Sequence, residues 1–292
     1  MIRSDIHVHT TFCDGKNSAE EMISEAISKD FVSLGFSGHS YTSFDDGWCM
    51  SEEDTEKYIE TTLSLRKKYS GTIDILLGTE RDFFADEDRH TYNYIIGSSH
   101  YVKVGNEYLT VDKSAEEQTK IINGYFGRDT FAFIKAYYAQ EAEIIKKTNC
   151  DVIGHFDLVT KFNEGGKMFD ENSDAYKKIV YQTLEELVIS KPIFEVNTGA
   201  MTRGYRTRPY PADFILDYVS VHGCGLVLTS DCHKKALLGG FFDETEKRLH
   251  ERGLNNIFCA DLKRFYSRKV KQISSKRYRG CKETRVSYSP EC

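Results

Sequence analysis

The chain has 292 residues, a formal net charge of −6 and 40% hydrophobic residues, which is enough for a full core. This length fits one α/β barrel of about 250 residues with an appendage. No segment approaches the ~18 apolar residues of a membrane span, and the N-terminus does not resemble a signal peptide. We therefore expect a cytoplasmic protein with no membrane partner.

The charge is distributed unevenly along the chain. Residues 263–292 carry a net charge of +8, whereas the remainder carries −14. We therefore divide the chain into a barrel domain, residues 1–262, and a basic C-terminal tail, residues 263–292. A basic tail can bind nucleic acid or an acidic partner, but more often it is a solvated end. We adopt the solvated end and expect no nucleic-acid partner, and the sequence leaves a homo-oligomer open.

The 8 cysteines contain no Cys-x-x-Cys pair. In a chain of this length without a signal peptide, they are interpreted as reduced thiols. Cys232 lies between two candidate ligands but is expected to point to the opposite face.

Segments typical of strands and helices alternate along the chain. Strands are expected at residues 2–10, 32–37, 73–80, 94–100, 151–155, 193–197, 226–230 and 257–259. Helices are expected after the capping box at 18–21, and at 51–68, 114–124, 129–147, 173–190, 211–223 and 242–252. This alternation predicts a parallel α/β sheet, and the seven main units favour a distorted barrel over an open sheet.

The first strand carries His7 and His9 at a spacing of two. Residues at this spacing point to the same face of a strand, so both imidazoles can reach one metal ion. Asp231 and His233 repeat the spacing after the buried strand at 226–230. In a closed parallel barrel the first and last strands are neighbours, and active residues lie at the strand C-termini. The four side chains are therefore expected to meet.

Other predicted strands also end on residues that bind metals. The candidate ligands are His7, His9, Asp14, His39, Glu80, His100, His155, Asp231 and His233. Six of the 9 histidines of the chain belong to this set, which chance placement does not explain. Nine ligands exceed the four of a single zinc ion and suffice for two to three divalent metals if a carboxylate bridges. Mixed nitrogen and oxygen ligation without thiolate favours Zn, Mn or Fe.

These motifs resemble the polymerase-and-histidinol-phosphatase (PHP) superfamily. His7-Val8-His9 with Asp14 resembles its first motif, His39 its second, Glu80 and His100 its third, and Asp231-Cys232-His233 its last. The resemblance spans residues 4–240 and is strongest to stand-alone histidinol-phosphatases, through the stretches 96–101, 153–158, 195–199 and 209–211. One departure is Gly38 before His39, where many relatives carry Asp.

The resemblance implies a distorted (β/α)7 TIM-like barrel with a trinuclear metal site at the C-terminal ends of the strands. His7, His9, Glu80 and Asp231 would hold the first metal. Glu80, His100 and His155 would hold the second, with Glu80 as the bridge. Asp14, His39 and His233 would hold the third. Glu80, Asp231 and His233 are the candidate catalytic residues, because metals held there would activate water and neutralise phosphoryl charge.

A small phosphorylated substrate also needs cationic groups that position its phosphate. Arg203 and Arg206 follow the sixth predicted strand, and Lys161 follows the fifth, so all three are candidates for phosphate binding. Asn197 and Glu195 are candidates for the polar end of the substrate.

The leading hypothesis is hydrolysis of L-histidinol phosphate to L-histidinol and phosphate, a reaction of histidine biosynthesis. The alternatives are a related phosphoesterase that acts on nucleotides, oligonucleotides or phosphotyrosine, and a non-catalytic metal-binding module. The filled set of nine ligand positions disfavours the module.

Overall fold

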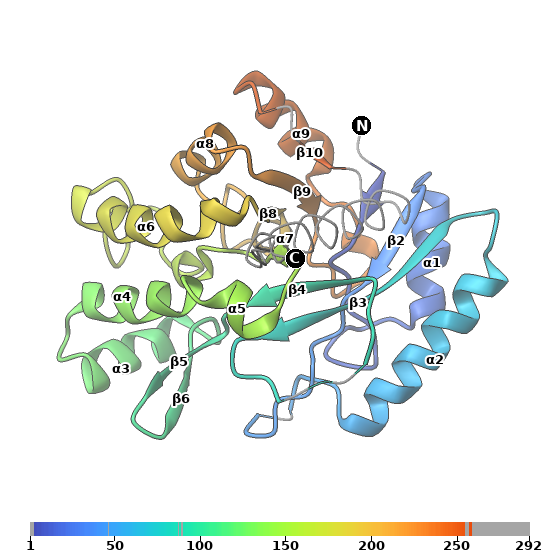
Figure 1. The fold of residues 1–292 in the computed structure, drawn as a ribbon, viewed down its shortest axis with the longest axis horizontal. Coiled ribbons are helices and arrows are strands. Elements are labelled where there is room, and N and C mark those ends of the chain that lie inside the picture. The colour runs from blue at the N-terminus through green and yellow to red at the C-terminus, as the bar shows by residue number, and fades with distance from the viewer. Residues whose placement is uncertain (1–2, 46, 87, 89, 255–256, 259–292) are drawn as a thin grey trace, which may run out of the picture.

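The computed structural model describes residues 3–45, 47–86, 88, 90–254 and 257–258. Its centre is a parallel sheet that curves into a nearly closed barrel (Figure 1). In spatial order the strands are β1 (Ser4–Asp5), β2 (Ser33–Phe36), β3 (Asp74–Asp82), β4 (Tyr94–Ser98), β7 (Val152–Ile153), β8 (Ile193–Asn197), β9 (Gly225–Thr229) and β10 (Ile257–Phe258). All neighbouring strands are parallel, so the predicted barrel class is confirmed.

The barrel closes between the first strand and β9. Val8, just beyond β1, forms an isolated parallel bridge with Cys232. The backbone N–H of Cys232 donates to the carbonyl of His7 (3.0 Å), and that of His9 donates to the carbonyl of Cys232 (2.9 Å). These contacts hold the two histidine-bearing segments side by side at the C-terminal end of the barrel, as the sequence predicted.

In its N-terminal half, β9 has β10 as its hydrogen-bonded neighbour on this side. β10 pairs with the first half of β9, with Ile257 opposite Leu226. The strand expected at 257–259 is therefore present over Ile257–Phe258, while Cys259 lies outside the described residues. Asp5 is fully buried near the seam and accepts hydrogen bonds from the hydroxyl and the backbone N–H of Ser230, which ties β1 to the end of β9.

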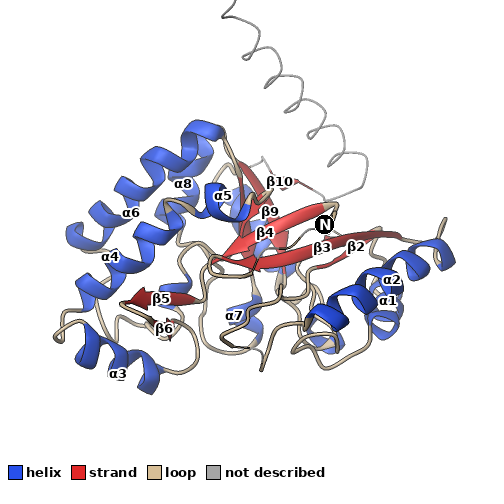
Figure 2. Ribbon diagram, turned by 60° about the horizontal axis from the view of Figure 1, so that its bottom comes forward, coloured by secondary structure: helices blue, strands red, loops and turns tan. Residues whose placement is uncertain are grey.

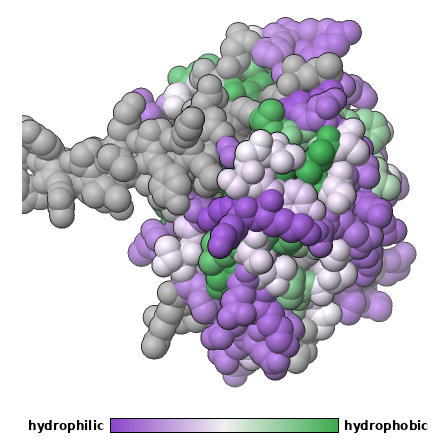
Figure 3. Space-filling model, turned by 90° about the vertical axis from the view of Figure 1, so that its right-hand side faces the viewer, coloured by the Kyte–Doolittle hydropathy of each residue, from purple (hydrophilic) through white to green (hydrophobic). Residues whose placement is uncertain are grey.

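Helices cover the outside of the barrel (Figure 2). They are α1 (Ala19–Ser28), α2 (Glu52–Lys68), α3 (Ala115–Tyr125), α4 (Thr130–Glu141), α5 (Ile144–Thr148), α6 (Asp174–Leu187), α7 (Gly199–Thr202), α8 (Asp213–Val221) and α9 (Phe242–Glu251), with 3-10 turns at Leu158–Thr160, Val188–Ser190 and Lys235–Leu237. The predicted capping box forms at Ser18 and Glu21, which satisfies N–H groups at the start of α1. Figure 3 shows the side of the molecule that carries α1 and α2, where hydrophilic residues predominate.

Two hydrophobic clusters lie on the two faces of the sheet. The smaller one consists of Ile6, Leu76, Tyr94, Ile96, Val152, Ile193 and Val227. These residues come from six different strands or strand extensions, so the cluster fills the barrel interior below the polar end. The larger cluster packs the helices against the outer face of the sheet.

A β-hairpin that the sequence reading missed follows β4. It consists of β5 (Tyr101–Val104) and β6 (Glu107–Thr110), which pair antiparallel around Gly105 and Asn106. A two-residue Gly-Asn connection between β-rich runs is a hairpin signal that could have revealed it. The hairpin begins directly after the candidate ligand His100, so it stands at the edge of the polar end of the barrel.

Three further expectations concern the cysteines, the lack of a membrane span and the basic tail. Cys13, Cys49, Cys150, Cys224 and Cys232 are free thiols. Within the described part of the chain, no helix combines the length and apolar character needed to cross a membrane. The basic tail at 263–292 and the domain boundary at 262 lie outside the described residues.

Candidate metal centre

The nine predicted ligands converge at the C-terminal ends of the strands. His7 and His9 follow β1, Asp14 lies in the next loop, His39 follows β2, Glu80 lies within β3, His100 follows β4, His155 follows β7, and Asp231 and His233 follow β9. The histidines and Glu80 are buried or nearly so, and Asp14 is the most exposed member, with 32% of its side chain accessible. Segments separated by more than 200 residues thus form one polar cluster at this end of the barrel.

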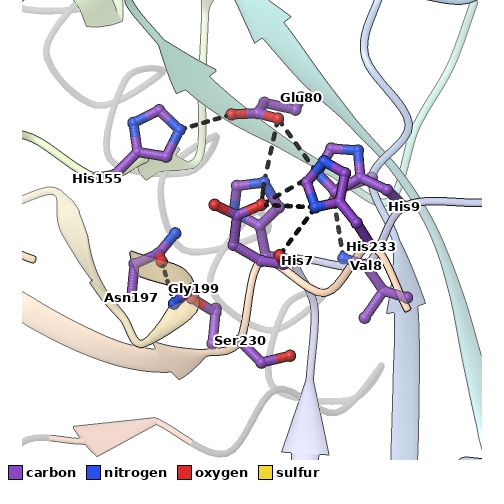
Figure 4. Close-up of polar contacts among 12 residues, drawn as sticks. His7, Val8, His9, Glu80, His155, Asn197, Gly199, Ser230 and His233 are labelled. Atoms are coloured by element: carbon purple, nitrogen blue, oxygen red, sulfur yellow. Dashed lines mark hydrogen bonds and ion pairs between the residues drawn. The ribbon is translucent and has the colours of Figure 1, made fainter. Parts of the chain in front are cut away.

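Glu80 contacts histidines on both sides of the cluster, and Figure 4 shows its carboxylate between His155 and the other rings. Its Oε2 atom lies 3.1 Å from His7 Nε2, 3.4 Å from His9 Nε2 and 3.0 Å from His39 Nδ1. Its other oxygen, Oε1, lies 2.9 Å from His155 Nε2 and 3.4 Å from His100 Nε2. The two oxygens of one carboxylate therefore face two separate sets of imidazoles, as a bridging ligand requires.

Asp14 and Asp231 border the remaining side of the cluster. Asp14 lies 3.1 Å from His233 Nε2, 3.7 Å from His39 Nε2 and 3.8 Å from His9 Nδ1. Asp231 Oδ1 lies 3.4 Å from His233 Nδ1 and 3.5 Å from His9 Nε2. His9 is therefore shared between the central group and the group around Asp14.

Several atoms in the cluster are buried without a hydrogen-bond partner. They are His7 Nε2, His9 Nε2, Asp14 Oδ1, His39 Nδ1, Glu80 Oε2 and His155 Nδ1. Buried polar atoms without a partner are costly, so this concentration fits residues that bind a cation instead of one another. Within the described residues, three groups bring ligand atoms close enough for a metal ion: His9-Asp14-His39-His233, His7-His9-Glu80 and His39-Glu80-His100.

The electrostatics of the cluster keep its carboxylates ionised. Burial alone would raise the pKa of Glu80, but His7, His39 and His100 outweigh it and hold that pKa well below its usual value. Burial would likewise raise the pKa of Asp231, but Arg203 and His7 hold it well below. Burial, together with His233 and His39, lowers the pKa of His9 to about 3. His9 is therefore a neutral imidazole, as a metal ligand must be. Neighbouring carboxylates outweigh burial and raise the pKa of His7, His100 and His233, so metal binding would release protons from these rings.

Two buried carboxylates outside the ligand set orient the histidines. The Nδ1–H of His7 donates to Glu195, and the ring and backbone N–H groups of His100 both donate to Asp82 Oδ2, at 3.1 and 2.9 Å. Each contact leaves Nε2 of the same ring facing Glu80. Such carboxylates fix the tautomer and direction of metal-binding histidines. Asp82 was not identified from the sequence, although it lies two residues after Glu80 at the end of the same strand.

A cavity of about 600 Å³ opens onto the cluster. Beyond the candidate ligands, its wall includes Lys16, Asp45, Gly47, Trp48, Tyr101, Thr110, Asp112, Lys113, Leu158, Lys161, Arg203 and Tyr205. Arg203 and Lys161 thus stand where the sequence expected them. The Arg203 guanidinium donates to Asp231 Oδ2 (2.9 Å) and to its carbonyl (3.2 Å), and Lys161 Nζ donates to Asp112 (3.0 Å).

Other expected substrate contacts lie elsewhere. Arg206 is not part of the cavity wall: its guanidinium donates to both oxygens of Glu171 (2.7 and 2.9 Å) and to the carbonyl of Thr160 (2.8 Å). These partners come from a loop that the sequence pattern did not place, and a role of Arg206 in phosphate binding stays a prediction.

Asn197 and Glu195 are fully buried and also lie outside the cavity wall. The amide of Asn197 donates to Glu195. Its oxygen accepts from the backbone N–H of Gly199 (Figure 4). Both residues therefore support the cluster from below, and their contact with the polar end of the substrate stays a prediction. Both point inward because alternate residues of β8 share a face.

The fold and the buried cluster together define a (β/α) barrel of the metal-binding type. The family model described as PHP domain matches residues 5–199, and the chain belongs to this family.

Named relatives match over most of their length. The chain is 25% identical to "Probable histidinol-phosphatase" of Schizosaccharomyces pombe, over 86% of this chain and 87% of that protein. It is 25% identical to histidinol-phosphatase of Bacillus subtilis, over 82% of this chain and 96% of that protein.

Solved structures share the fold. A structure described as "putative histidinol phosphatase" from Listeria monocytogenes has a TM-score of 0.70 at 21% identity, covering 82% of this chain and 98% of that one. Another, from Lactococcus lactis, has a TM-score of 0.59 at 16% identity, covering 85% and 94%; it is described as complexed with Zn, L-histidinol and phosphate.

Proposed function

We propose that this protein is a metal-dependent phosphatase that hydrolyses L-histidinol phosphate to L-histidinol and phosphate. The observation that carries the proposal is Glu80, whose two oxygens face separate sets of imidazoles at the base of a cavity that also contains Arg203 and Lys161. The names of the relatives in the same family support the substrate.

We propose the following ligand sets for two to three divalent transition metals. His7, His9, Glu80 and Asp231 hold the first, and Glu80, His100 and His155 hold the second. Asp14, His39 and His233 hold the third. The unpartnered buried atoms of these residues support the assignment, as does the preference of Zn, Mn and Fe for mixed imidazole and carboxylate ligands.

When bound, the metals supply an acidified water as nucleophile and positive charge beside the phosphoryl oxygens. The chain's own residues prepare the site for this chemistry. Glu195 and Asp82 hold His7 and His100 with their Nε2 atoms directed at Glu80. Arg203 fixes Asp231 and adds positive charge to the cavity wall. Lys161 adds a second positive charge on the wall, and both cations favour an anionic ester over a neutral one.

The test is phosphate release from L-histidinol phosphate, compared with p-nitrophenyl phosphate and a short oligonucleotide. We expect the highest kcat/KM for histidinol phosphate, loss of activity after removal of metal by a chelator, and recovery when Zn or Mn is restored. A preference for the oligonucleotide would favour the alternative phosphoesterase. Absence of turnover on all three substrates by protein with at least two metal equivalents would favour a non-catalytic module.

The assignment of Glu80 as a bridge makes a separate prediction. Glu80→Gln removes charge shared by two metals, whereas His39→Ala removes one ligand of one metal. We expect Glu80→Gln to lower both metal content and kcat more than His39→Ala does, by roughly tenfold or more in kcat. Elemental analysis and steady-state kinetics check this. Equal losses in the two variants would contradict the bridge.

A further inference from the structure

One wall of the cavity is built by aromatic side chains that hold a carboxylate. The hydroxyl of Tyr101 donates to Asp45 Oδ2 (2.7 Å), and the indole N–H of Trp48 donates to the same hydroxyl (2.7 Å). All three residues line the cavity.

This wall is joined rigidly to the candidate metal ligands. The ring of Trp48 packs edge-on against His39 and His100, with centroid distances of 4.3 and 5.3 Å. Tyr101 directly follows His100, and Phe44 packs against its other side at 5.0 Å. The position of the Asp45 carboxylate relative to the metal cluster is therefore set by packed rings on both sides.

Asp45 differs from the other carboxylates of the cavity in having no cation beside it. Asp112 is paired with Lys161 (3.0 Å), and Asp231 with Arg203 (2.9 Å). Among the described residues, no lysine, arginine or histidine forms an ion pair with Asp45. A half-buried carboxylate held in place by donors, and without a protein cation, is suited to bind a cation from a ligand.

We propose that Asp45 determines substrate specificity by binding a positively charged nitrogen of the substrate, so that the site selects phosphate monoesters that carry a cation. The inference rests on the proposed function for the position of the phosphate, which lies at the metal cluster. L-Histidinol phosphate carries two suitable nitrogens, its ammonium group and its imidazole.

The experiment compares Asp45→Asn with the wild type on three esters. They are L-histidinol phosphate, its N-acetyl derivative, which lacks the ammonium charge, and p-nitrophenyl phosphate, which carries no cation. Asparagine can still accept the hydrogen bond of Tyr101, so the wall is retained while its charge is lost. We expect the ratio of kcat/KM for histidinol phosphate to that for p-nitrophenyl phosphate to fall by at least about tenfold. If the ammonium is the bound group, Asp45→Asn and the wild type should hydrolyse the N-acetyl ester at similar rates.

Asp86→Asn is the matched control. Asp86 is exposed, accepts a hydrogen bond from the backbone N–H of Ser43 in the same loop as Asp45 (2.7 Å), and does not line the cavity. The Asp86→Asn variant therefore loses the same charge close to Asp45 without changing the cavity wall. We expect its substrate ratio to stay within about twofold of the wild-type ratio.

A readout that does not depend on turnover is the binding of L-histidinol to metal-loaded protein by calorimetry. Its Kd should rise by about tenfold or more in Asp45→Asn and stay unchanged in Asp86→Asn. A substrate ratio within threefold of wild type in Asp45→Asn, or an equal fall in Asp86→Asn, would overturn the inference.

The two proposals fail in distinguishable ways. If the wild type hydrolyses p-nitrophenyl phosphate but not histidinol phosphate, the proposed function fails. The same ratio is then measured with O-phosphoethanolamine as the cationic ester. A wild type that shows no preference for this ester over p-nitrophenyl phosphate would overturn the role of Asp45 as well.

Discussion

Glu195 accepts four hydrogen bonds with its two oxygens. His7 Nδ1 and the hydroxyl of Thr229 donate to Oε1, and the backbone N–H of His155 and the amide of Asn197 donate to Oε2. A carboxylate can accept all four, whereas the NH₂ group of a carboxamide cannot accept any. The position therefore requires an anion, and its effect reaches two candidate ligands, His7 and His155.

We therefore expect Glu195→Gln to weaken metal binding even though Glu195 is not a ligand. Loss of such an outer carboxylate typically lowers metal affinity by about 10–100-fold. Calorimetric titration of the chelator-treated protein with Zn measures this metal affinity directly. Asp82→Asn should show a similar but smaller loss, because Asp82 orients His100 alone. Wild-type Zn affinity in Glu195→Gln would show that packing alone holds His7.

Arg203 contacts candidate metal ligands in addition to lining the cavity, where its sequence position suggested that it binds phosphate. Its NH1 and NH2 groups already contact Asp231, and NH1 also lies 3.3 Å from His233 Nδ1. Lysine cannot reproduce this fork. We expect Arg203→Lys to lower kcat/KM by about 30–150-fold, and to lower metal content as well, because Asp231 loses its anchor. Kinetics combined with elemental analysis would separate the roles: full metal content with low kcat/KM would mean that Arg203 acts on the substrate alone.

At the scale of elements, strand ends were predictable from the sequence and side-chain partners were not. His39, His100 and His155 each follow a short β-rich run, so the barrel topology alone places them at one end. The partners of Arg206 depend on the path of the loop that carries Glu171, which has no periodic pattern. The hairpin β5–β6 was missed because its strands are short and partly exposed.

In the barrel interior, the side chain of Tyr94 lies close to two glycines. This close packing is a second constraint at the scale of elements. Its hydroxyl donates to the carbonyls of Ile6 (2.6 Å) and Phe36 (2.8 Å), and a Cβ on Gly78 would lie 2.2 Å from its ring. We expect Gly78→Ala to lower the free energy of unfolding by about 3 kcal/mol, the upper part of the range for overpacking. Urea denaturation measures this.

Gly124→Ala is the control for this substitution. It also adds a methyl group, but in helix α3 with no atom within 4 Å, and should stabilise the protein by up to about 1 kcal/mol. Equal stability of Gly78→Ala and the wild type would mean that Tyr94 can move aside.

At the scale of the whole molecule, the fold buries several acids that the metal centre does not use. Burial raises the pKa of Glu141 from its ordinary value of 4.5 to about 8, although contacts with Ser99 and Tyr137 and the charge of His100 oppose the shift. Burial also raises the pKa of Asp5 to about 6 and of Asp157 to about 7. All three therefore keep their proton to a higher pH in the folded protein than in the unfolded chain.

The stability contribution of these three acids should therefore fall as the pH rises. Between pH 4.5 and 8 the unfolded chain releases the proton of Glu141 while the folded protein retains it, so unfolding becomes more favourable throughout this interval. The contribution is fully present below pH 4.5 and is lost once the pH passes 8. A carboxamide has no proton to lose, so Glu141→Gln should be insensitive to this effect.

We expect the free energy of unfolding of Glu141→Gln, relative to wild type, to rise by about 3 kcal/mol between pH 5.5 and 8.5. Urea denaturation of both proteins at pH 5.5, 7.0 and 8.5 provides the measurement. Asp5 and Asp157 titrate in both proteins, so their contributions cancel in the difference and only Glu141 remains. Parallel curves for the two proteins would show that Glu141 is already ionised in the folded state, with Ser99 and Tyr137 hydrogen-bonded to the carboxylate. A relative gain that builds up between pH 5.5 and 8 and levels off above pH 8 would show that neutral Glu141 is held inside the fold by burial.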